Sequence, residues 1–331
     1  MRQGGRYLIL LLIIVAGIAL GLFIGPAGLS PHDVLRALRP GEEPEVARRI
    51  VLELRLPRVI AALFVGASLA VSGAVFQALL RNPLAEPYLL GVSSGAALAA
   101  VGAIALGLGS LGGLLVPVAA LVGALVAISI VFAVARVSDQ LDTRVLILAG
   151  VVVSAFFGAC ITLVLTLSPA ETLRSAFFWT LGSLSGISWR MNAVLVAWSV
   201  PATLAAWSLA RHLDALALGE ETAAGIGTDV ERVKRQAFLL ASLLAAVTVS
   251  VAGVIGFVGL VVPHAVRMLW GSGHRHLIPT SFLAGGGALL LMDVAARAIG
   301  GPVEIPIGVV TAFLGVPFFL VLLRRKGRSA A

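Results

Sequence analysis

Charged side chains are scarce in this chain. Asp, Glu, Lys and Arg make up 12% of its 331 residues, whereas a soluble domain carries about 25%. Hydrophobic residues reach 59%, and the mean hydropathy is +1.05. A soluble globule of this size cannot bury so much apolar surface, so the composition excludes a soluble enzyme or binding domain. The bilayer is the natural solvent, and we predict an all-α polytopic membrane protein.

Cysteine and lysine are also nearly missing. The one cysteine, Cys160, lies in an apolar run and allows neither an internal disulfide nor a cysteine metal cluster. The two lysines, Lys234 and Lys326, do not follow a glycine, so there is no Walker A motif and the chain is not itself a P-loop ATPase. His274 and His276 could form a metal site, but a solvated loop is the favoured interpretation of this stretch. We therefore expect no bound metal.

Basic residues give a net charge of +8, which in a soluble protein would suggest a nucleic-acid partner. Here they lie in short loops between apolar runs, and no stretch alternates basic with aromatic residues, so we expect no nucleic acid. Placing both termini inside puts most of the 24 Lys and Arg residues on the cytoplasmic side. This predicts a multi-pass protein of the bacterial inner membrane, surrounded by lipid, with both termini cytoplasmic.

Apolar runs long enough to cross a bilayer, about 20 residues each, recur along the chain. The first, from Leu8 to Ile24, follows Arg2 and Arg6 as in a signal peptide, but it is long enough to span and no A-x-A site closes it. We interpret it as a retained helix. We predict ten spans, at about residues 7–25, 57–79, 91–108, 114–135, 144–167, 191–210, 236–254, 256–270, 277–298 and 305–323. The eighth is short and contains Pro263, which is tolerated where protein or water satisfies the freed backbone groups.

Acidic residues are rare within these spans, although a proton-driven or sodium-driven carrier usually keeps an ionisable group at membrane depth. The nearest candidate is Asp293, four residues before Arg297, and this spacing predicts an ion pair near the outer end of the ninth span. Such a pair is typical of a structural or entrance contact rather than a proton relay. The driving force would then come from a partner, with an ion-coupled secondary carrier as the alternative.

Two polar segments lie outside the spans. Residues 26–56, periplasmic in the predicted topology, concentrate arginines among acidic residues, which indicates either a docking surface or a solvated helix, and composition slightly favours the helix. Residues 211–235 form the largest cytoplasmic loop, long enough for two short helices that Gly225 and Gly227 would separate. Composition does not decide whether this loop docks a cytoplasmic partner or merely connects two spans.

Several long motifs, in order along nearly the whole chain, resemble the FecCD-type permeases, which are the membrane subunits of type II ABC importers for ferric siderophores, haem and vitamin B12. The motifs are RLPRVIAALFVGASLAVSGAVFQALLRNPLAEPYLLGVSSGAAL (55–98), LILAGV (146–151), FWTLGSLSGISW (178–189), LGEETAAGIG (218–227), GFVGLVVPHAVRML (256–269), MDVAAR (292–297) and EIPIGVVTAFLGVPFFLVLL (304–323).

The resemblance implies a single permease domain over residues 1–331, with ten transmembrane helices as in the vitamin B12 importer, working as a homodimer. Its partners would be two cytoplasmic ATPase subunits, which hold the ATP and Mg, and a periplasmic substrate-binding protein. The chain itself would bind no cofactor and would not be an enzyme. Family frequency ranks a siderophore first as the substrate, then haem, then cobalamin.

The resemblance also carries roles over to individual residues. Binding-protein docking by exposed arginines is implied for Arg55, Arg58 and Arg297. A cytoplasmic gate is implied at Asn82, Leu84 and Thr143. The next position, Arg144, departs from the small hydroxyl residue of the family, which puts Thr143 in question. Coupling to the ATPases is implied for Leu218, Gly219, Glu220, Glu221, Gly225 and Gly227. On the fifth span, the residues expected to line the pathway are Ser154, Thr162 and Thr166.

Overall fold

The computed structural model describes residues 3–39, 45–110, 113–137, 140–300 and 304–329. Each predicted span contains a helix, which confirms the all-helical polytopic fold. These helices are α1 (Gln3–Phe23), α4 (Leu56–Leu79), α5 (Val92–Ala105), α6 (Leu115–Ala135), α7 (Thr143–Thr166), α9 (Trp189–Ser208), α12 (Val230–Ala252), α13 (Val258–Trp270), α14 (His274–Gly300) and α15 (Ile307–Ser329).

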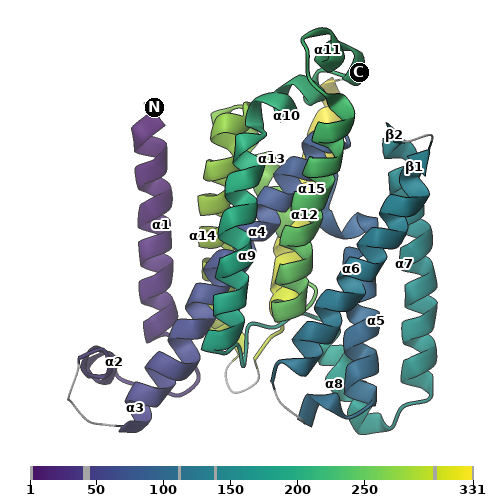
Figure 1. Ribbon diagram of the computed structural model, residues 1–331. Coiled ribbons are helices and arrows are strands. Elements are labelled where there is room, and N and C mark those ends of the chain that lie inside the picture. The colour runs from purple at the N-terminus through teal and green to yellow at the C-terminus, as the bar shows by residue number, and fades with distance from the viewer. Residues whose placement is uncertain (1–2, 40–44, 111–112, 138–139, 301–303, 330–331) are drawn as a thin grey trace.

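Shorter elements, most of them not predicted, join these helices. They are α2 (Pro31–Ala37), α3 (Glu45–Arg49), the π-helix η1 (Ile50–Arg55), the 3-10 helices η2 (Pro87–Leu90) and η3 (Leu108–Ser110), α8 (Ala170–Thr180), α10 (Ala210–Ala217), α11 (Glu220–Gly225), and the antiparallel strands β1 (Arg136–Val137) and β2 (Gln140–Leu141). The helices α2 and α3 lie at one end of the bundle, and α10 and α11 lie at the opposite end (Figure 1). We call these the α3 end and the α11 end.

Seven helices in the described part of the chain are long and apolar enough to cross a membrane. One of them is the continuous run of α3, η1 and α4 from Glu45 to Leu79. The apolar helices α5 and α13 are shorter, with 14 and 13 residues, and so rise only about 20 Å each. That is less than the hydrocarbon core of about 30 Å. Each is preceded by non-α-helical chain, and these two preceding segments meet, as described below.

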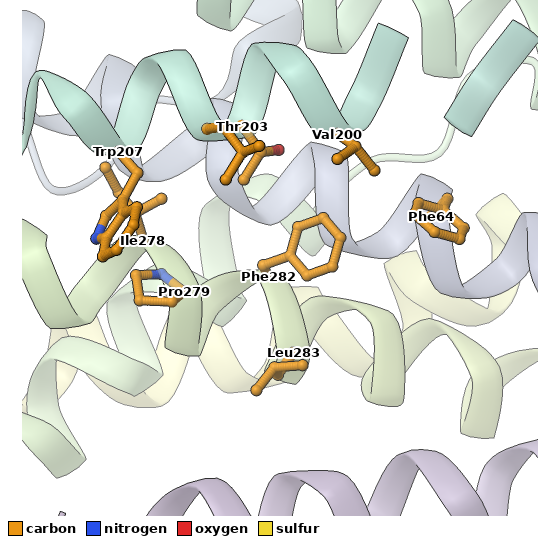
Figure 2. Close-up of a pocket in the computed structure, with 9 residues that line it drawn as sticks. Phe64, Val200, Thr203, Trp207, Ile278, Pro279, Phe282 and Leu283 are labelled. Carbon is orange, nitrogen blue, oxygen red and sulfur yellow. The ribbon is translucent and has the colours of Figure 1, made fainter. Parts of the chain in front are cut away.

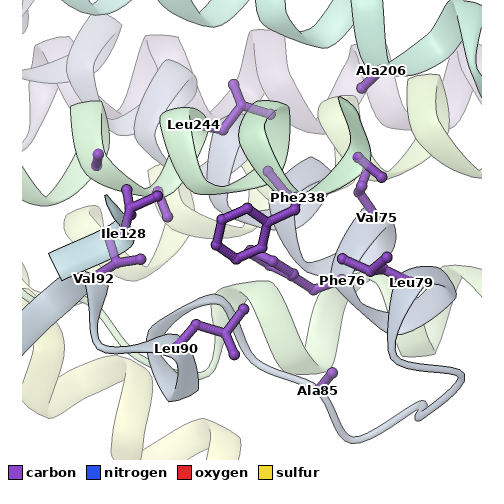
Figure 3. Close-up of a cluster of buried hydrophobic side chains, with 14 of the residues drawn as sticks. Val75, Phe76, Leu79, Ala85, Leu90, Val92, Ile128, Ala206, Phe238 and Leu244 are labelled. Carbon is purple, nitrogen blue, oxygen red and sulfur yellow. The ribbon is translucent and has the colours of Figure 1, made fainter. Parts of the chain in front are cut away.

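Helix α4 is the centre of the bundle, with α9, α12, α13 and α14 packed around it. It is mostly buried because its small residues let neighbouring backbones approach. Gly66 faces Gly285 of α14 so closely that a Cβ on either residue would overlap the carbonyl oxygen of the other. Larger side chains fill the core nearer the α11 end (Figure 3). There the Phe238 ring packs edge-on against Phe76, with ring centroids 6.2 Å apart.

Candidate functional site

An ion cluster is buried at the α3 end of the bundle. The predicted pair forms, with Arg297 Nη2 3.0 Å from Asp293 Oδ2. The same carboxylate also binds Arg58, whose Nε donates to Asp293 Oδ1 at 2.9 Å. Arg58 Nη1 reaches on to Glu304 at 2.8 Å. Asp293 is 1% exposed, so one acidic group does lie buried in a span, held between two guanidinium groups.

Arg297 and a third arginine, Arg55, bind backbone carbonyls at the C-terminal end of α1. Arg297 Nη1 donates to the carbonyls of Gly21 and Ile24 at 2.9 and 2.7 Å. Arg55 Nη1 donates to the carbonyl of Leu22 at 2.6 Å. The last carbonyls of a helix have no partner within it, and basic groups satisfy them. These bonds fasten the end of α1 to η1 and to the last turn of α14.

The expectation that these arginines are exposed was wrong. Arg55, Arg58 and Arg297 are 5%, 9% and 4% exposed, because unpartnered carbonyls and two carboxylates draw them inward. Their role in docking a binding protein stays a prediction. Glu304, which the sequence reading did not single out, lies at the rim of the cluster, with 31% of its side chain exposed.

Residues 80–91, between α4 and α5, carry two of the predicted gate residues, Asn82 and Leu84, and are called the gate loop here. The loop is partly buried against the bundle. Arg81 has a positive φ of 48°, and the side chain of Asn82 accepts a hydrogen bond from the backbone N–H of Leu84 at 2.9 Å. Further along, Glu86 Oε1 accepts from the backbone N–H of Phe257, immediately before α13, at 2.7 Å. A carboxylate at a helix N-terminus is favourable. The loop before α5 is thereby joined to the start of α13.

Thr143 is the first residue of α7. Asp142 caps this helix by accepting the N–H groups of Arg144 and Val145 at 2.8 and 3.1 Å, and these bonds lower the pKa of the Asp142 carboxyl. Thr143 and Arg144 line a polar cavity of about 440 Å³ together with Arg81 and with Glu220 and Lys234. The last two belong to residues 211–235, called the coupling segment from here on. The structure therefore brings the beginning of α7 close to the gate loop, although the role of Thr143 in gating stays a prediction.

A buried lysine joins the coupling segment to the rest of the α11 end. Lys234 Nζ lies 3.0 Å from Glu220 on α11 and 2.7 Å from Glu231 on its own helix. The other oxygen of Glu231 accepts the backbone N–H of Leu141, two residues before α7, at 2.7 Å. A chain of contacts thus runs from α11 through Lys234 and Glu231 to α7. This hub was not predicted, although Glu231 and Lys234 stand at the i,i+3 spacing of a helical ion pair.

The coupling segment does contain two short helices, but Gly219, with φ +121°, separates them. The prediction that Gly225 and Gly227 would do so was wrong: Gly225 ends α11, and Gly227 lies in the turn before α12. A left-handed or otherwise unusual backbone requires glycine at Gly219. The segment exposes two large apolar side chains, Leu218 at 73% and Ile226 at 68%, and Glu221 is exposed as well.

His274 was expected in a solvated loop, and this was wrong. It is buried at the start of α14, where its Nδ1 lies 2.6 Å from Asp214 Oδ1 and its backbone N–H donates to the same oxygen at 2.9 Å. Burial raises the pKa of the Asp214 carboxyl, but the bonds from His274 outweigh it and the net pKa is lowered. His276 is exposed in the first turn of α14. Within the residues that the structure describes, no three His, Cys, Asp or Glu side chains gather as metal ligands.

The three residues expected to line the pathway do not share one environment. Ser154 faces α5, with its Oγ 3.4 Å from Ser94 Oγ. Thr162 and Thr166 lie on the exposed part of α7, and their hydroxyls donate to carbonyls of the preceding turn at 3.0 and 2.8 Å. Only the two threonines therefore face away from the chain's own core, and lining of a pathway stays a prediction.

Known proteins resemble this chain over nearly its whole length. The sequence matches the FecCD transport family over residues 10–325. The cobalamin import system permease protein BtuC of Halobacterium salinarum is 44% identical over 283 residues, which cover 86% of this chain and 75% of that protein. The vitamin B12 import system permease protein BtuC of Salmonella paratyphi A is 39% identical over 328 residues, which cover 99% of this chain and 97% of that one. A solved structure described as an inward-facing metal-chelate type ABC transporter is 32% identical, with a TM-score of 0.84 over 96% of this chain and 97% of that one.

Proposed function

The chain belongs to the FecCD transport family, and from that premise we propose that it carries a bulky metal chelate from a periplasmic binding protein into the cytoplasm. It is a multi-pass permease of the ABC importer type. The observation that supports the mechanism best is the meeting of three parts at the α11 end. The coupling segment, the gate loop and the first turn of α7 all reach one polar cavity.

The α11 end is cytoplasmic in this proposal, and it receives the work of two partner ATPases. The exposed apolar side chains of Leu218 and Ile226 would enter a cleft on the ATPase, with Glu221 at the rim. Closure of the ATPases would then move α11, and the contacts of Lys234 would pass that movement to α7 as a rigid body. The gate loop, held to α13 by Glu86, moves relative to α7 and opens the exit.

The α3 end is periplasmic in the same proposal and docks the binding protein. A carboxylate of the binding protein would compete with Glu304 for Arg58, because Glu304 is the rim partner and Asp293 is the buried one. A guanidinium group binds a carboxylate through two hydrogen bonds in a defined geometry. Such an exchange would therefore fix the orientation of the docked binding protein. The arginine cluster thus acts after docking begins rather than as an open surface.

A second copy of the chain completes the pathway in this proposal. Helix α7 offers a broad apolar face, with Leu148 and Phe156 both 64% exposed, and Thr162 and Thr166 face the same open side. The pathway would run between two such helices. Asp293, bound on both sides by arginines, gives no support to an ion-coupled carrier, so ATP hydrolysis by the partners supplies the driving force.

Cobalamin becomes the first candidate substrate, ahead of an iron chelate such as a siderophore or haem. Two relatives at 39% and 44% identity are named for vitamin B12 or cobalamin, and the structural neighbour is named for metal chelates. All these candidates are large metal complexes.

The test is uptake into proteoliposomes that contain the chain with its partner ATPase, with the binding protein added outside. We expect ATP-dependent accumulation of cyanocobalamin that needs both partners and resists a proton uncoupler. Accumulation of a ferric siderophore or haem instead would keep the importer and change the substrate. Uptake that needs neither partner and stops with the uncoupler would overturn the proposal in favour of a secondary carrier.

A further inference from the structure

An apolar groove runs between α9 and α14, with α4 as its floor (Figure 2). Its volume is about 430 Å³, within the range of about 300–1,000 Å³ that small-molecule sites occupy. The lining runs lengthwise from Trp207, Ile278 and Pro279 at one end to Phe64 at the other. Thr203 supplies the one hydroxyl of the nine lining residues. The groove is therefore long, narrow and parallel to the helices.

The shape of the groove and its position in the membrane indicate which kind of molecule it binds. α9 and α14 both pack on α4 and touch each other little, so the groove opens sideways from the bundle. Leu204 and Val200 on its edge are exposed. Because these helices cross a membrane, the medium beside the groove is hydrocarbon, and an extended acyl chain lying along the helices is the molecule that fits it. Dispersion contacts along such a chain add up over its length.

The end of the groove near the α11 end is built for a polar group. Trp207 is 44% exposed, and its indole N–H donates to the backbone carbonyl of Arg275 at 2.9 Å. An amphipathic ring at a span end is typical of the headgroup level. The side chain of Arg275 is exposed there. Arg211, also exposed, lies four residues after Trp207, at the start of α10.

Arg211 and Arg275 lie on two neighbouring elements, α10 and α14. The bond between Asp214 of α10 and His274 of α14 brings the element that carries Arg211 beside the element that carries Arg275. The same bond engages the carboxylate of Asp214. Two exposed guanidinium groups at the polar end of an apolar groove complement an anionic headgroup.

We propose that this groove is the site of a resident anionic phospholipid. One acyl chain lies between α9 and α14, and its phosphate binds Arg211 and Arg275 beside the Trp207 indole. The bound lipid fills the space between the two helices and fastens α14 to α10, the first helix of the coupling segment. This site is independent of the transported substrate and of the partner proteins.

Brominated lipids test the site directly, because bromine on an acyl chain quenches a tryptophan only on contact. The protein is reconstituted in phosphatidylcholine that contains a minor fraction of brominated phosphatidylglycerol, or the same fraction of brominated phosphatidylcholine. The signal of Trp207 is the difference between the wild type and Trp207→Phe. Trp198, exposed on the same helix but outside the groove lining, gives the matched control through Trp198→Phe.

We expect Trp207 to be quenched more strongly by the anionic lipid, and Trp198 to be quenched equally by both lipids. From the contribution of one basic residue near a membrane surface, Arg211→Gln and Arg275→Gln should each lower the preference about fivefold. Equal quenching of Trp207 by both lipids in the wild type would overturn the proposal. A preference that survives both substitutions would also overturn it, because the headgroup would then lie elsewhere.

A second measurement needs no tryptophan substitution. The wild type is purified in mild detergent from membranes that contain phosphatidylglycerol, and native mass spectrometry counts the lipids that stay bound. We expect one retained phosphatidylglycerol per chain, and its loss in Thr203→Phe, which fills the groove. Val152→Phe, on the exposed face of α7, should retain it. A wild type that keeps no phospholipid, or keeps phosphatidylcholine equally well, would rule out the site.

Discussion

Lys234 and Glu220 bind each other across two elements, with Nζ 3.0 Å from Oε2. The lysine side chain is buried, whereas the glutamate is partly exposed. Glu220 belongs to the short helix α11, and Lys234 belongs to the long helix α12. Through Glu231 the same lysine reaches the backbone just before α7. In the proposed mechanism, this pair passes a displacement of α11 to the bundle.

Replacing this lysine should separate ATP hydrolysis from transport. Lys234→Met removes two charged hydrogen bonds, worth together about 1–3 kcal/mol because both partners are partly exposed. We expect fewer substrate molecules transported per ATP in proteoliposomes, while binding of the ATPase is kept. Arg232→Met, which removes the same charge from an exposed position two residues earlier, is the control. An unchanged ratio of transport to hydrolysis in Lys234→Met would show that the hub only holds α12 in place.

The two acids of the arginine cluster should differ in effect. Asp293→Asn leaves Arg58 and Arg297 buried without their shared anion, and the loss of one partner of a buried ion pair costs about 3–5 kcal/mol. Glu304→Gln breaks only a half-exposed pair, worth about 1 kcal/mol or less. The melting temperature in detergent should therefore fall sharply for Asp293→Asn and only a little for Glu304→Gln. Equal losses would contradict the assignment of Asp293 as the central anion.

Glu304→Gln carries a second expectation, which depends on the proposed docking. If a carboxylate of the binding protein replaces Glu304 at Arg58, removing the charge of Glu304 removes the competitor. Affinity for the binding protein should then rise severalfold, up to about fivefold for 1 kcal/mol. Surface plasmon resonance on nanodisc-embedded protein measures it. A weaker affinity in Glu304→Gln would mean that Glu304 itself faces the binding protein.

The pair of Asp214 and His274 should make stability depend on pH in acid. The pKa of the folded Asp214 lies below its ordinary value of 3.8, so its contribution is complete above that value and is lost as the pH falls through the lowered pKa. We expect Asp214→Asn to be less stable by about 1 kcal/mol at neutral pH, since the carboxylate is partly exposed. The difference from the wild type should shrink as the pH falls below 3.8 and disappear once the pH is below the lowered pKa. A difference that stays constant into strong acid would place the effect in packing.

The contact of α4 with α14 should not tolerate a methyl group. Gly66→Ala would place its Cβ on the carbonyl oxygen of Gly285, so the helices must separate, and overpacking of this kind costs about 1–3 kcal/mol or more. Gly158→Ala on α7, where nothing lies within 4 Å of an added Cβ, should be neutral or stabilising by up to about 1 kcal/mol. The melting temperatures of the two variants, measured side by side, test this expectation. Similar melting temperatures would argue against the close approach.

The gate hypothesis rests on Leu84, which is half-buried in the loop after α4. Shortening it to Leu84→Ala should let substrate leak from loaded vesicles or raise ATP hydrolysis without transport. Leu89→Ala, an exposed leucine of the adjoining η2, is the control and should stay tight. A tight, fully coupled Leu84→Ala transporter would reduce the loop to a turn, held by the side chain of Asn82.

Local composition was enough to predict the helices, because an apolar run of sufficient length satisfies its own backbone in a membrane in only one way. It also predicted the ion pair between Asp293 and Arg297, which needs nothing beyond the spacing of one helical turn. The short span that became α13, with Pro263 inside it, was also predicted from its local apolar run. By contrast, the exposure assumed for Arg55, Arg58 and Arg297 failed, because each also has partners far away in the sequence. These lie on α1 for Arg55 and Arg297, and on α14 and the segment after it for Arg58.

The sequence by itself determined that this chain is a helical membrane protein of the FecCD transport family, since hydropathy, spacing and long motifs are read along one dimension. Only the tertiary structure decided which polar groups meet. Lys234 finds Glu220 fourteen residues away, His274 finds Asp214 at a separation of 60, and Glu86 reaches the start of α13 at 171. A buried polar group must find a partner wherever the packing of helices offers one. That packing follows from the close contacts of the whole bundle, which no local pattern records.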